Sequence, residues 1–145
     1  MTSNNLIAKA QATINAPVDK VWDALIDPAM IKKYMFGTTV KSDWKEGSKI
    51  TWSGEWEGKN YEDKGEILTF QPMKKLAYSH YSPLTGQEDI PENYHNVTIE
   101  LEDKGDQTNI TLTQDNNTSE QEKEHSEKNW NMMLEGMKKL LEEES

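Results

Sequence analysis

His80 and His95 are the side chains of this sequence best suited to acid–base chemistry, because an imidazole gains or loses its proton near neutral pH. In the alternating pattern of a β-strand, His80 shares a face with Tyr78, and His95 shares a face with Val97. Both rings are therefore expected to point towards the apolar side of a sheet. If they line one hollow, they could exchange protons with a ligand or form hydrogen bonds with it. They could equally be hydrogen-bonded histidines of the core or its rim.

Aromatic residues in the same region could wall a binding site for an amphipathic small molecule. Trp52, Trp56, Tyr78 and Tyr94 combine large apolar rings with an N–H or O–H group at the tip. Packing between a sheet and a helix would use the same rings, so both interpretations stay open.

Small residues fall beside these rings. Gly54 lies between the two tryptophans on one strand face, and Gly136 lies on the predicted last helix. They could leave room inside the protein, or they could allow close approach of two backbones.

Motifs for other chemistry are absent from the sequence. It has no glycine-rich phosphate loop and no H-E-x-x-H or EF-hand motif. Zero cysteines exclude thiol nucleophiles and thiolate metal ligands. Ser42 and Lys45 have the S-x-x-K spacing but lie in a predicted strand and turn, not at a helix start. We therefore expect no catalytic set, no metal and no cofactor, and the sequence favours a protein that is not an enzyme.

The charge of the chain excludes further classes. The formal net charge is −10, and every one of the 16 basic residues is lysine. Nucleic-acid binding depends on neutralising phosphates, so an acidic chain without arginine is not expected to bind nucleic acid. No apolar stretch is long enough to insert into a membrane, and the first 15 residues do not resemble a signal peptide, so we expect a cytoplasmic protein.

A long amphipathic helix is predicted over residues 118–144. Its apolar residues recur at helical spacing and form one stripe. Ser119 and Glu122 have the spacing of a capping box at its start. The stripe consists of Trp130, Met133, Leu134, Met137, Leu140 and Leu141.

The rest of the chain alternates as strands, apart from short helices that begin at Pro17 and Pro28, the second ending near Met35. Strands are predicted over residues 6–14, 39–44, 48–57, 61–70, 76–82, 94–102 and 108–114, with a polar loop over 82–92. The long helix must bury its stripe against this sheet, an arrangement that tends to enclose a hollow. The prediction is one α+β domain over residues 1–145.

Several segments also resemble the START-like SRPBCC superfamily, in the branch named after the C-terminal domain of the activator of the heat-shock-protein-90 ATPase. Their order and spacing along the chain carry the resemblance. The matching segments are Ile14-Asn15-Ala16-Pro17-Val18, Val21-Trp22-Asp23-Ala24-Leu25, Asp27-Pro28, Asp43-Trp44-Lys45-Glu46-Gly47-Ser48, Lys64-Gly65-Glu66-Ile67-Leu68 with Pro72 and Leu76, and Asn129-Trp130 through Leu140.

The resemblance implies a helix-grip fold, in which a curved antiparallel sheet wraps around the C-terminal helix, with short helices after the first strand. It also implies a hydrophobic cavity between sheet and helix, which in this family often holds lipids, polyketides or other apolar molecules. One fold hosts many functions, so no shared reaction is implied. A chaperone partner is implied by the resemblance alone.

From these observations we expect a small intracellular protein that binds an apolar or amphipathic small molecule between the sheet and the last helix. A hollow too small for a few heavy atoms would exclude this function. The alternatives are a chaperone-interacting module, with a filled interior and an exposed apolar patch, and a cyclase- or hydrolase-type enzyme using His80 or His95. The predicted lining residues are Trp52, Trp56, Tyr78, His80, His95, Val97, Ile110, Leu112, Trp130, Met133, Leu134 and Met137.

Overall fold

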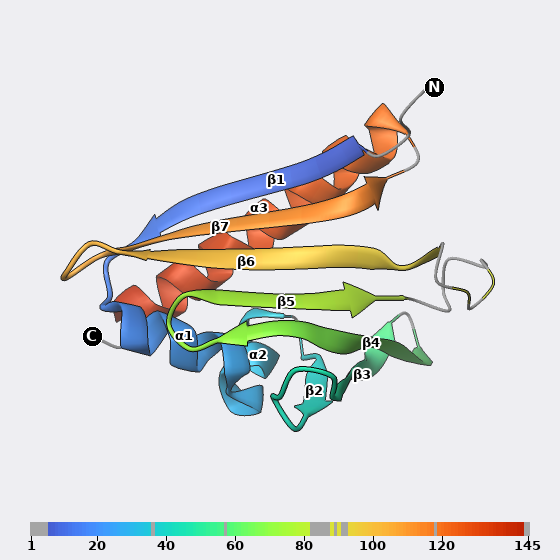
Figure 1. Cartoon of the computed structure of the whole chain (residues 1–145), viewed down its shortest axis with the longest axis horizontal. Coiled ribbons are helices and arrows are strands. Elements are labelled where there is room, and N and C mark those ends of the chain that lie inside the picture. Colours follow the sequence, from blue (N-terminus) through green and yellow to red (C-terminus); the bar gives the residue numbers. More distant parts are fainter. Residues whose placement is uncertain are drawn as a thin grey trace.

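A computed structural model describes residues 6–35, 37–56, 58–81, 88, 90, 93–117 and 119–143. Within them, seven strands form one antiparallel sheet in the order β1-β7-β6-β5-β4-β3-β2. The elements are β1 (Leu6–Ile14), α1 (Val18–Ile26), α2 (Pro28–Tyr34), β2 (Thr39–Ser42), β3 (Lys49–Trp56), β4 (Lys59–Gln71), β5 (Lys75–His80), β6 (His95–Asp103), β7 (Thr108–Asn117) and α3 (Glu120–Glu143). The helix α3 crosses one face of the sheet diagonally (Figure 1). The predicted helix-grip architecture is confirmed.

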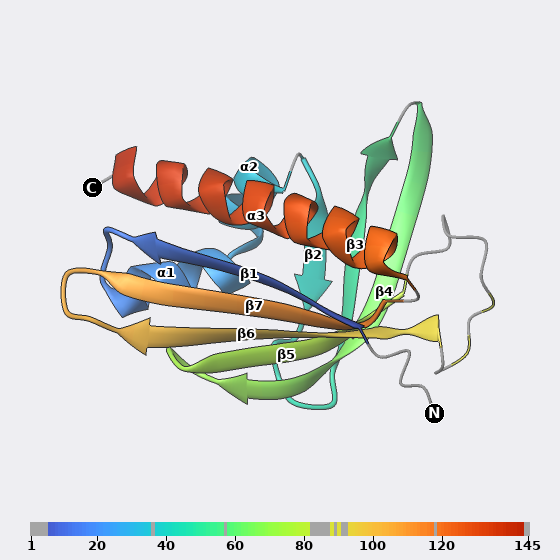
Figure 2. The same cartoon turned by 90° about the horizontal axis from the view of Figure 1, so that it is seen from above.

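The sheet curves because β4 changes its partner halfway along. Its first part pairs with β3 and its last part with β5, with an irregularity between Ile67 and Thr69. At the change of partner, Gly65 allows the backbones of β4 and β5 to come so close that a Cβ would lie 1.7 Å from the carbonyl oxygen of Ser79. As a result β3 and the first half of β4 rise beside α3 (Figure 2). The curved sheet and the helix together enclose the core.

The core follows the alternation of the strands. In β7, for example, Ile110 and Leu112 are fully buried, whereas Thr111 and Thr113 lie on the outer face of the sheet. From α3, the residues Met133, Leu134, Met137 and Leu141 pack against these inner faces. Burial of apolar surface on one face of each element is the main source of stability in such a layer.

The ends of the helices match their sequence signals. The carboxylate of Asp27 accepts a hydrogen bond from the N–H of Ala29 at 3.0 Å and so begins α2. The predicted cap at Ser119 is confirmed, because its Oγ accepts from the N–H of Glu122 at 3.1 Å. These contacts satisfy N–H groups that the first turn of a helix leaves without partners.

Some predicted boundaries are wrong by a few residues. The strand predicted to end at Trp44 ends at Ser42, and the backbone of Trp44 adopts a left-handed conformation with φ of 55°. The Ser42 hydroxyl accepts the N–H of Trp44 at 3.0 Å and closes a local turn instead of continuing the strand. The last strand continues to Asn117, beyond the predicted end at Gln114. The loop predicted over residues 82–92 lies mostly outside the described residues.

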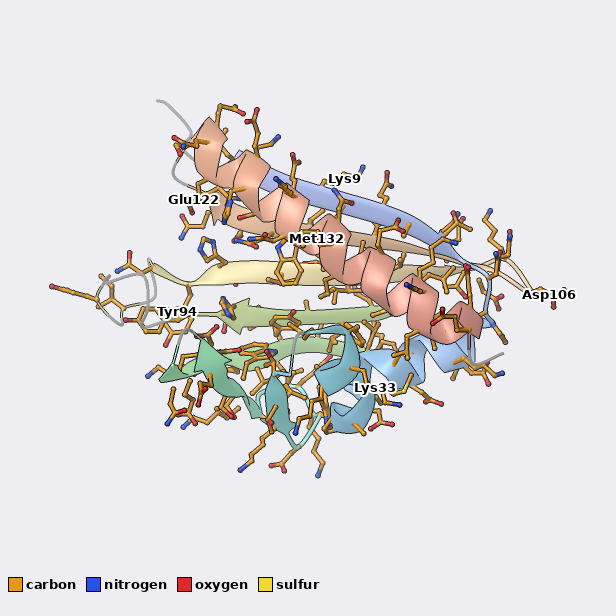
Figure 3. The ribbon with its side chains drawn as sticks, turned by 180° about the vertical axis from the view of Figure 1, so that it is seen from behind. Lys9, Lys33, Tyr94, Asp106, Glu122 and Met132 are labelled. Atoms are coloured by element: carbon orange, nitrogen blue, oxygen red, sulfur yellow. The ribbon has the colours of Figure 1, made fainter. Side chains whose placement is uncertain are left out.

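Glutamates of α3 occupy main-chain N–H groups at the β1 edge of the sheet. Glu127 accepts a hydrogen bond from the N–H of Lys9 at 3.0 Å, and Glu142 accepts one from the N–H of Asn15 at 3.0 Å. β1 lies at one end of the strand order, and Figure 3 shows Lys9 beside α3. We call these the edge contacts of α3. They fix the position of the helix along β1 at both ends.

Each edge contact is supported by a lysine one turn earlier in α3. Lys123 lies 3.4 Å from Glu127, and Lys138 lies 2.5 Å from Glu142. The pKa of Glu127 is lowered mainly by the N–H of Lys9, and the pKa of Glu142 mainly by the ammonium group of Lys138. A carboxyl group whose pKa is lower in the folded state adds stability above its unfolded pKa, about 4.3, and loses this contribution as the pH falls through its folded pKa.

The double variant Glu127→Gln, Glu142→Gln is therefore expected to be less stable than the wild type near neutral pH. The difference should shrink in acid, because the wild-type carboxylates are then protonated too. Urea unfolding at about pH 7 and about pH 3 measures both effects. Glu124→Gln with Glu143→Gln, at exposed positions of the same helix, is the matched control for the change in net charge. A deficit of equal size at both pH values would contradict this account.

Candidate functional site

A pocket of about 390 Å³ opens between the N-terminal half of α3, β7 and the segment that joins α2 to β2. We call it the outer pocket. Its lining mixes apolar and neutral polar side chains, and its volume is that of a small-molecule site. The lining residues are Met35, Thr38, Gln114, Ser126, Asn129, Trp130 and Met133.

Polar contacts hold the walls of the outer pocket. The indole Nε1–H of Trp130 donates a hydrogen bond to Oε1 of Gln114, which joins α3 to β7 across the pocket. The hydroxyl of Ser126 donates to Oδ1 of Asn117 at 3.3 Å, one turn nearer the start of the helix. Gln114 is 8 % exposed, so a polar residue of the inner sheet face forms the base of the site.

A second, smaller and more enclosed space lies between α3, α2 and the sheet. This inner cavity measures about 20 Å³, room for on the order of one water molecule. Met35 and Met133 line both spaces and therefore separate them. The inner cavity is lined by Leu25, Ile31, Tyr34, Met35, Val40, Trp44, Ile50, Trp52, Leu76, Tyr78, Ile99 and Met133.

The tyrosines of the inner cavity stay protonated at neutral pH. Burial raises the pKa of Tyr34 and of Tyr78 well above the ordinary value, because a phenolate would be poorly solvated there. The hydroxyl of Tyr34 donates a hydrogen bond to the carbonyl oxygen of Ala24 at 2.8 Å. The deep space is thus bordered by neutral groups.

The predicted glycine positions show close packing rather than empty space. A Cβ on Gly54 would lie 2.9 Å from the hydroxyl of Tyr61, whose ring occupies that side of the strand. That hydroxyl also lies 2.8 Å from Oγ1 of Thr38, a residue that lines the outer pocket. Gly136 lies against the backbone of Tyr34, where a Cβ would be at ordinary contact distance, 3.7 Å.

The histidines lie away from both spaces. Nε2 of His80 is 3.0 Å from Oδ2 of Asp63, and its ring centroid lies 5.0 Å from that of Trp52. His95 donates from Nδ1 to the carbonyl oxygen of Asp115 at 2.8 Å. Each ring therefore has the polar partner that acid–base chemistry needs, but neither lines the outer pocket or the inner cavity. In the described residues, Oδ1 of Asp63 is the one buried side-chain oxygen or nitrogen without a hydrogen-bond partner.

The structure brings together some of the predicted lining residues and not others. Trp52, Tyr78 and Met133 line the inner cavity, and Trp130 and Met133 line the outer pocket. The fully buried side chains among the predicted lining residues belong to the packed core and line neither the outer pocket nor the inner cavity. These side chains are Val97, Ile110, Leu112, Leu134 and Met137. The side chain of Trp56 lies outside the described residues.

The sequence interpretation missed several residues of the outer pocket. Gln114 had a usable signal, because it is a polar residue on the apolar face of its strand, two positions after Leu112. Met35 lies just past the end of α2, and Thr38 lies in the connection to β2, so no periodic pattern marks them. Ser126 and Asn129 lie on α3 towards the pocket and outside the apolar stripe.

Other kinds of site find no support in the described part of the chain. No helix there is both long and apolar enough to cross a membrane. No group of three or more histidine or carboxylate side chains among those residues is placed to hold a metal ion.

Known proteins with the same architecture share this arrangement of elements. The solution structure of ChR145 from Cytophaga hutchinsonii is 61% identical, covers 96% of this chain and 95% of its own, and superposes with a TM-score of 0.85. CalU16 from Micromonospora echinospora is 25% identical, with coverages of 92% and 83% and a TM-score of 0.66. The Aha1 dimer from Colwellia psychrerythraea is 20% identical, with coverages of 94% and 96% and a TM-score of 0.71.

Among proteins with curated descriptions, no match is found. The family described as Activator of Hsp90 ATPase homolog 1-like protein matches residues 15–142. This match spans the elements from α1 to α3, including every residue that lines the outer pocket. The chain therefore belongs to the Activator of Hsp90 ATPase homolog 1-like family.

Proposed function

We propose that this protein binds a small amphipathic molecule in the outer pocket. The observation that carries the proposal is a site of about 390 Å³ with a tryptophan wall, a methionine floor and neutral polar groups at its base. Trp130 offers a broad apolar surface, and the flexible side chains of Met35 and Met133 can adapt to the shape of a ligand. The inner cavity by itself is too small for such a ligand.

The affinity expected of this pocket for a small aromatic probe is weak. A naphthalene-sized ligand would bury about 250 Å² of apolar surface, which corresponds to about 6 kcal/mol before the cost of association. Loss of translational and rotational freedom removes several kcal/mol of this gain, so a dissociation constant on the order of 1 mM or weaker is expected for such a probe.

The family name raises a second function, contact with the chaperone Hsp90. A protein interface of this kind would use a continuous exposed apolar patch. In the described residues, the exposed large apolar side chains lie on separate elements, among them Ile7 on β1, Leu68 on β4 and Met132 on α3. β1 and β4 are separated in the sheet by β7, β6 and β5. This distribution supports the small-molecule proposal over the chaperone contact.

Blocking the mouth of the pocket tests the proposal. Asn129 is exposed and lines the outer pocket, so Asn129→Trp should fill its entrance. We expect 2-acetonaphthone, a neutral bicyclic ketone, to shift the indole signal of Trp130 in nitrogen–proton NMR spectra of the wild type. The variant should bind the same probe at least about tenfold more weakly, since the ring of the new side chain takes the place of the probe.

Asn131→Trp is the matched control. Asn131 is exposed on α3 two positions further on, where a helix turns its side chains to another face. This variant should bind the probe like the wild type. Binding that survives Asn129→Trp, or no shift of the Trp130 signal in the wild type, would refute the proposal.

A further inference from the structure

The lining of the outer pocket contrasts with the rest of this highly charged chain. Charged residues make up 29% of the sequence, yet no charged side chain in the described part of the chain lines the pocket. An ion placed against Trp130 and Met133 would lose its hydration without gaining a counter-charge. The lining therefore disfavours carboxylates, phosphates and ammonium groups as the buried part of a ligand.

The orientation of the Gln114 amide is fixed by its neighbour. An indole N–H can only donate a hydrogen bond, so the Gln114 atom that faces Trp130 must be the acceptor Oε1. The Nε2 group consequently turns away from the indole, and within the described residues no acceptor bonds to it. Oδ1 of Asp63 is the one buried side-chain atom of the described residues without a partner, so Nε2 of Gln114 is not sealed off from solvent. Because Gln114 lines the pocket, water or the acceptor atom of a ligand can bond to this donor there.

The apolar part of a ligand has a defined place beside this donor. Trp130 and Met133 lie one turn apart on α3, on the side of the helix that lines the pocket. Beyond Met133 lies the inner cavity, which is bordered by apolar and aromatic side chains. A flat apolar body can thus lie against the indole while an oxygen atom at its edge meets the Gln114 amide.

We infer that the outer pocket selects uncharged ligands that carry a hydrogen-bond acceptor, such as a ketone or ester oxygen, at the edge of a flat apolar body. This inference rests on the proposed function and names the chemical class of its ligand. Gln114 is the residue that determines specificity, through its Nε2 donor. The indole contact of Trp130 holds that donor in place.

A series of probes of nearly equal size tests this selectivity on the native protein. The probes are 2-acetonaphthone, 2-isopropylnaphthalene, 2-naphthoate and 2-naphthylmethylammonium, titrated while the Trp130 indole and Gln114 side-chain amide signals are followed by NMR. The ketone should bind about threefold to tenfold more tightly than the hydrocarbon, the factor that one neutral hydrogen bond gives. The two ions should bind at least about tenfold more weakly than the ketone.

The variant Gln114→Glu tests the residue itself. A carboxylate at this position still accepts the indole N–H of Trp130, but it lacks the amide donor and adds a negative charge. The preference should therefore reverse, so that the ammonium probe binds more tightly than the ketone. Gln11→Glu is the matched control, because Gln11 lies on the outer face of β1, where it donates to Thr111. This control should keep the wild-type order of affinities.

The outcomes separate the two proposals. If no probe shifts the Trp130 indole signal, the proposed small-molecule function fails. If the probes bind at Trp130 but the ions match the ketone, or the ketone binds no better than the hydrocarbon, only the inferred ligand class is overturned. An unchanged order in a folded Gln114→Glu variant would likewise overturn the role of Gln114.

Discussion

Replacement of Gly65 by alanine is expected to lower the free energy of unfolding by about 3 kcal/mol or more. The new Cβ would lie 1.7 Å from the carbonyl oxygen and 2.6 Å from the carbonyl carbon of Ser79, which are backbone atoms and cannot rotate away. Relief requires β4 to move off β5 next to the paired hydrogen bonds between Lys64 and Tyr81, which measure 3.0 and 2.8 Å. Urea unfolding followed by tryptophan fluorescence measures the loss.

Gly136→Ala is the matched control for this substitution. Its Cβ would lie 3.7 Å from the nearest atoms of Tyr34, an ordinary van der Waals contact. Alanine is preferred over glycine within a helix by about 1 kcal/mol, so this variant should be as stable as the wild type or more stable. Equal losses from both substitutions would show that the close approach at Gly65 is not the cause.

Replacement of Met133 by alanine is expected to lower the free energy of unfolding by about 2–5 kcal/mol. Met133 is 5 % exposed and forms, with Met35, the wall between the outer pocket and the inner cavity. Truncation removes apolar contacts and joins the two spaces. We expect 2-acetonaphthone to recover part of the lost stability, because a ligand that binds the folded state stabilises it in proportion to its occupancy.

Met132→Ala is the control from the same turn of α3. Met132 is 52 % exposed and lies on the face of the helix that is turned away from the sheet (Figure 3). Its truncation should change the stability by less than about 0.5 kcal/mol and leave binding of the probe unchanged. A similar cost at both positions, or no recovery of Met133→Ala by the probe, would contradict the role of Met133 as a partition.

The fold was predictable because the spacing of apolar residues along the chain predicts most of its helices and strands. The stripe from Met133 to Leu141 marks α3, and the alternation of Ile110 and Leu112 marks β7. The boundary at Trp44 was not predictable in this way. Trp44 adopts a left-handed conformation in a turn that is closed by a local hydrogen bond to the hydroxyl of Ser42. An aromatic residue after a strand pattern instead predicts that the strand continues, because aromatic residues are common in strands.

The site was less predictable, because periodicity gives the direction of a side chain and not the distance to the opposite layer. Leu112 and Leu134 are both almost fully buried in the core and line neither the outer pocket nor the inner cavity, which periodicity alone does not reveal. Space remains one layer further along α3, at Trp130, where the opposing residue of β7 is the polar Gln114. The nonperiodic segment around Thr38 completes that pocket, and its position depends on the long-range curve of the sheet.

The edge contacts of α3 also affect how the β1 end of the sheet can meet other molecules. A strand with unoccupied main-chain N–H groups can add a strand from another molecule and start aggregation. At the β1 end, Glu127 and Glu142 already occupy the N–H groups of Lys9 and Asn15, so the helix that closes the core also shields this edge from other chains. This protection is strongest when the carboxylates of Glu127 and Glu142 are ionised. We therefore expect this edge to resist pairing with strands of other molecules at neutral pH and to resist it less in acid.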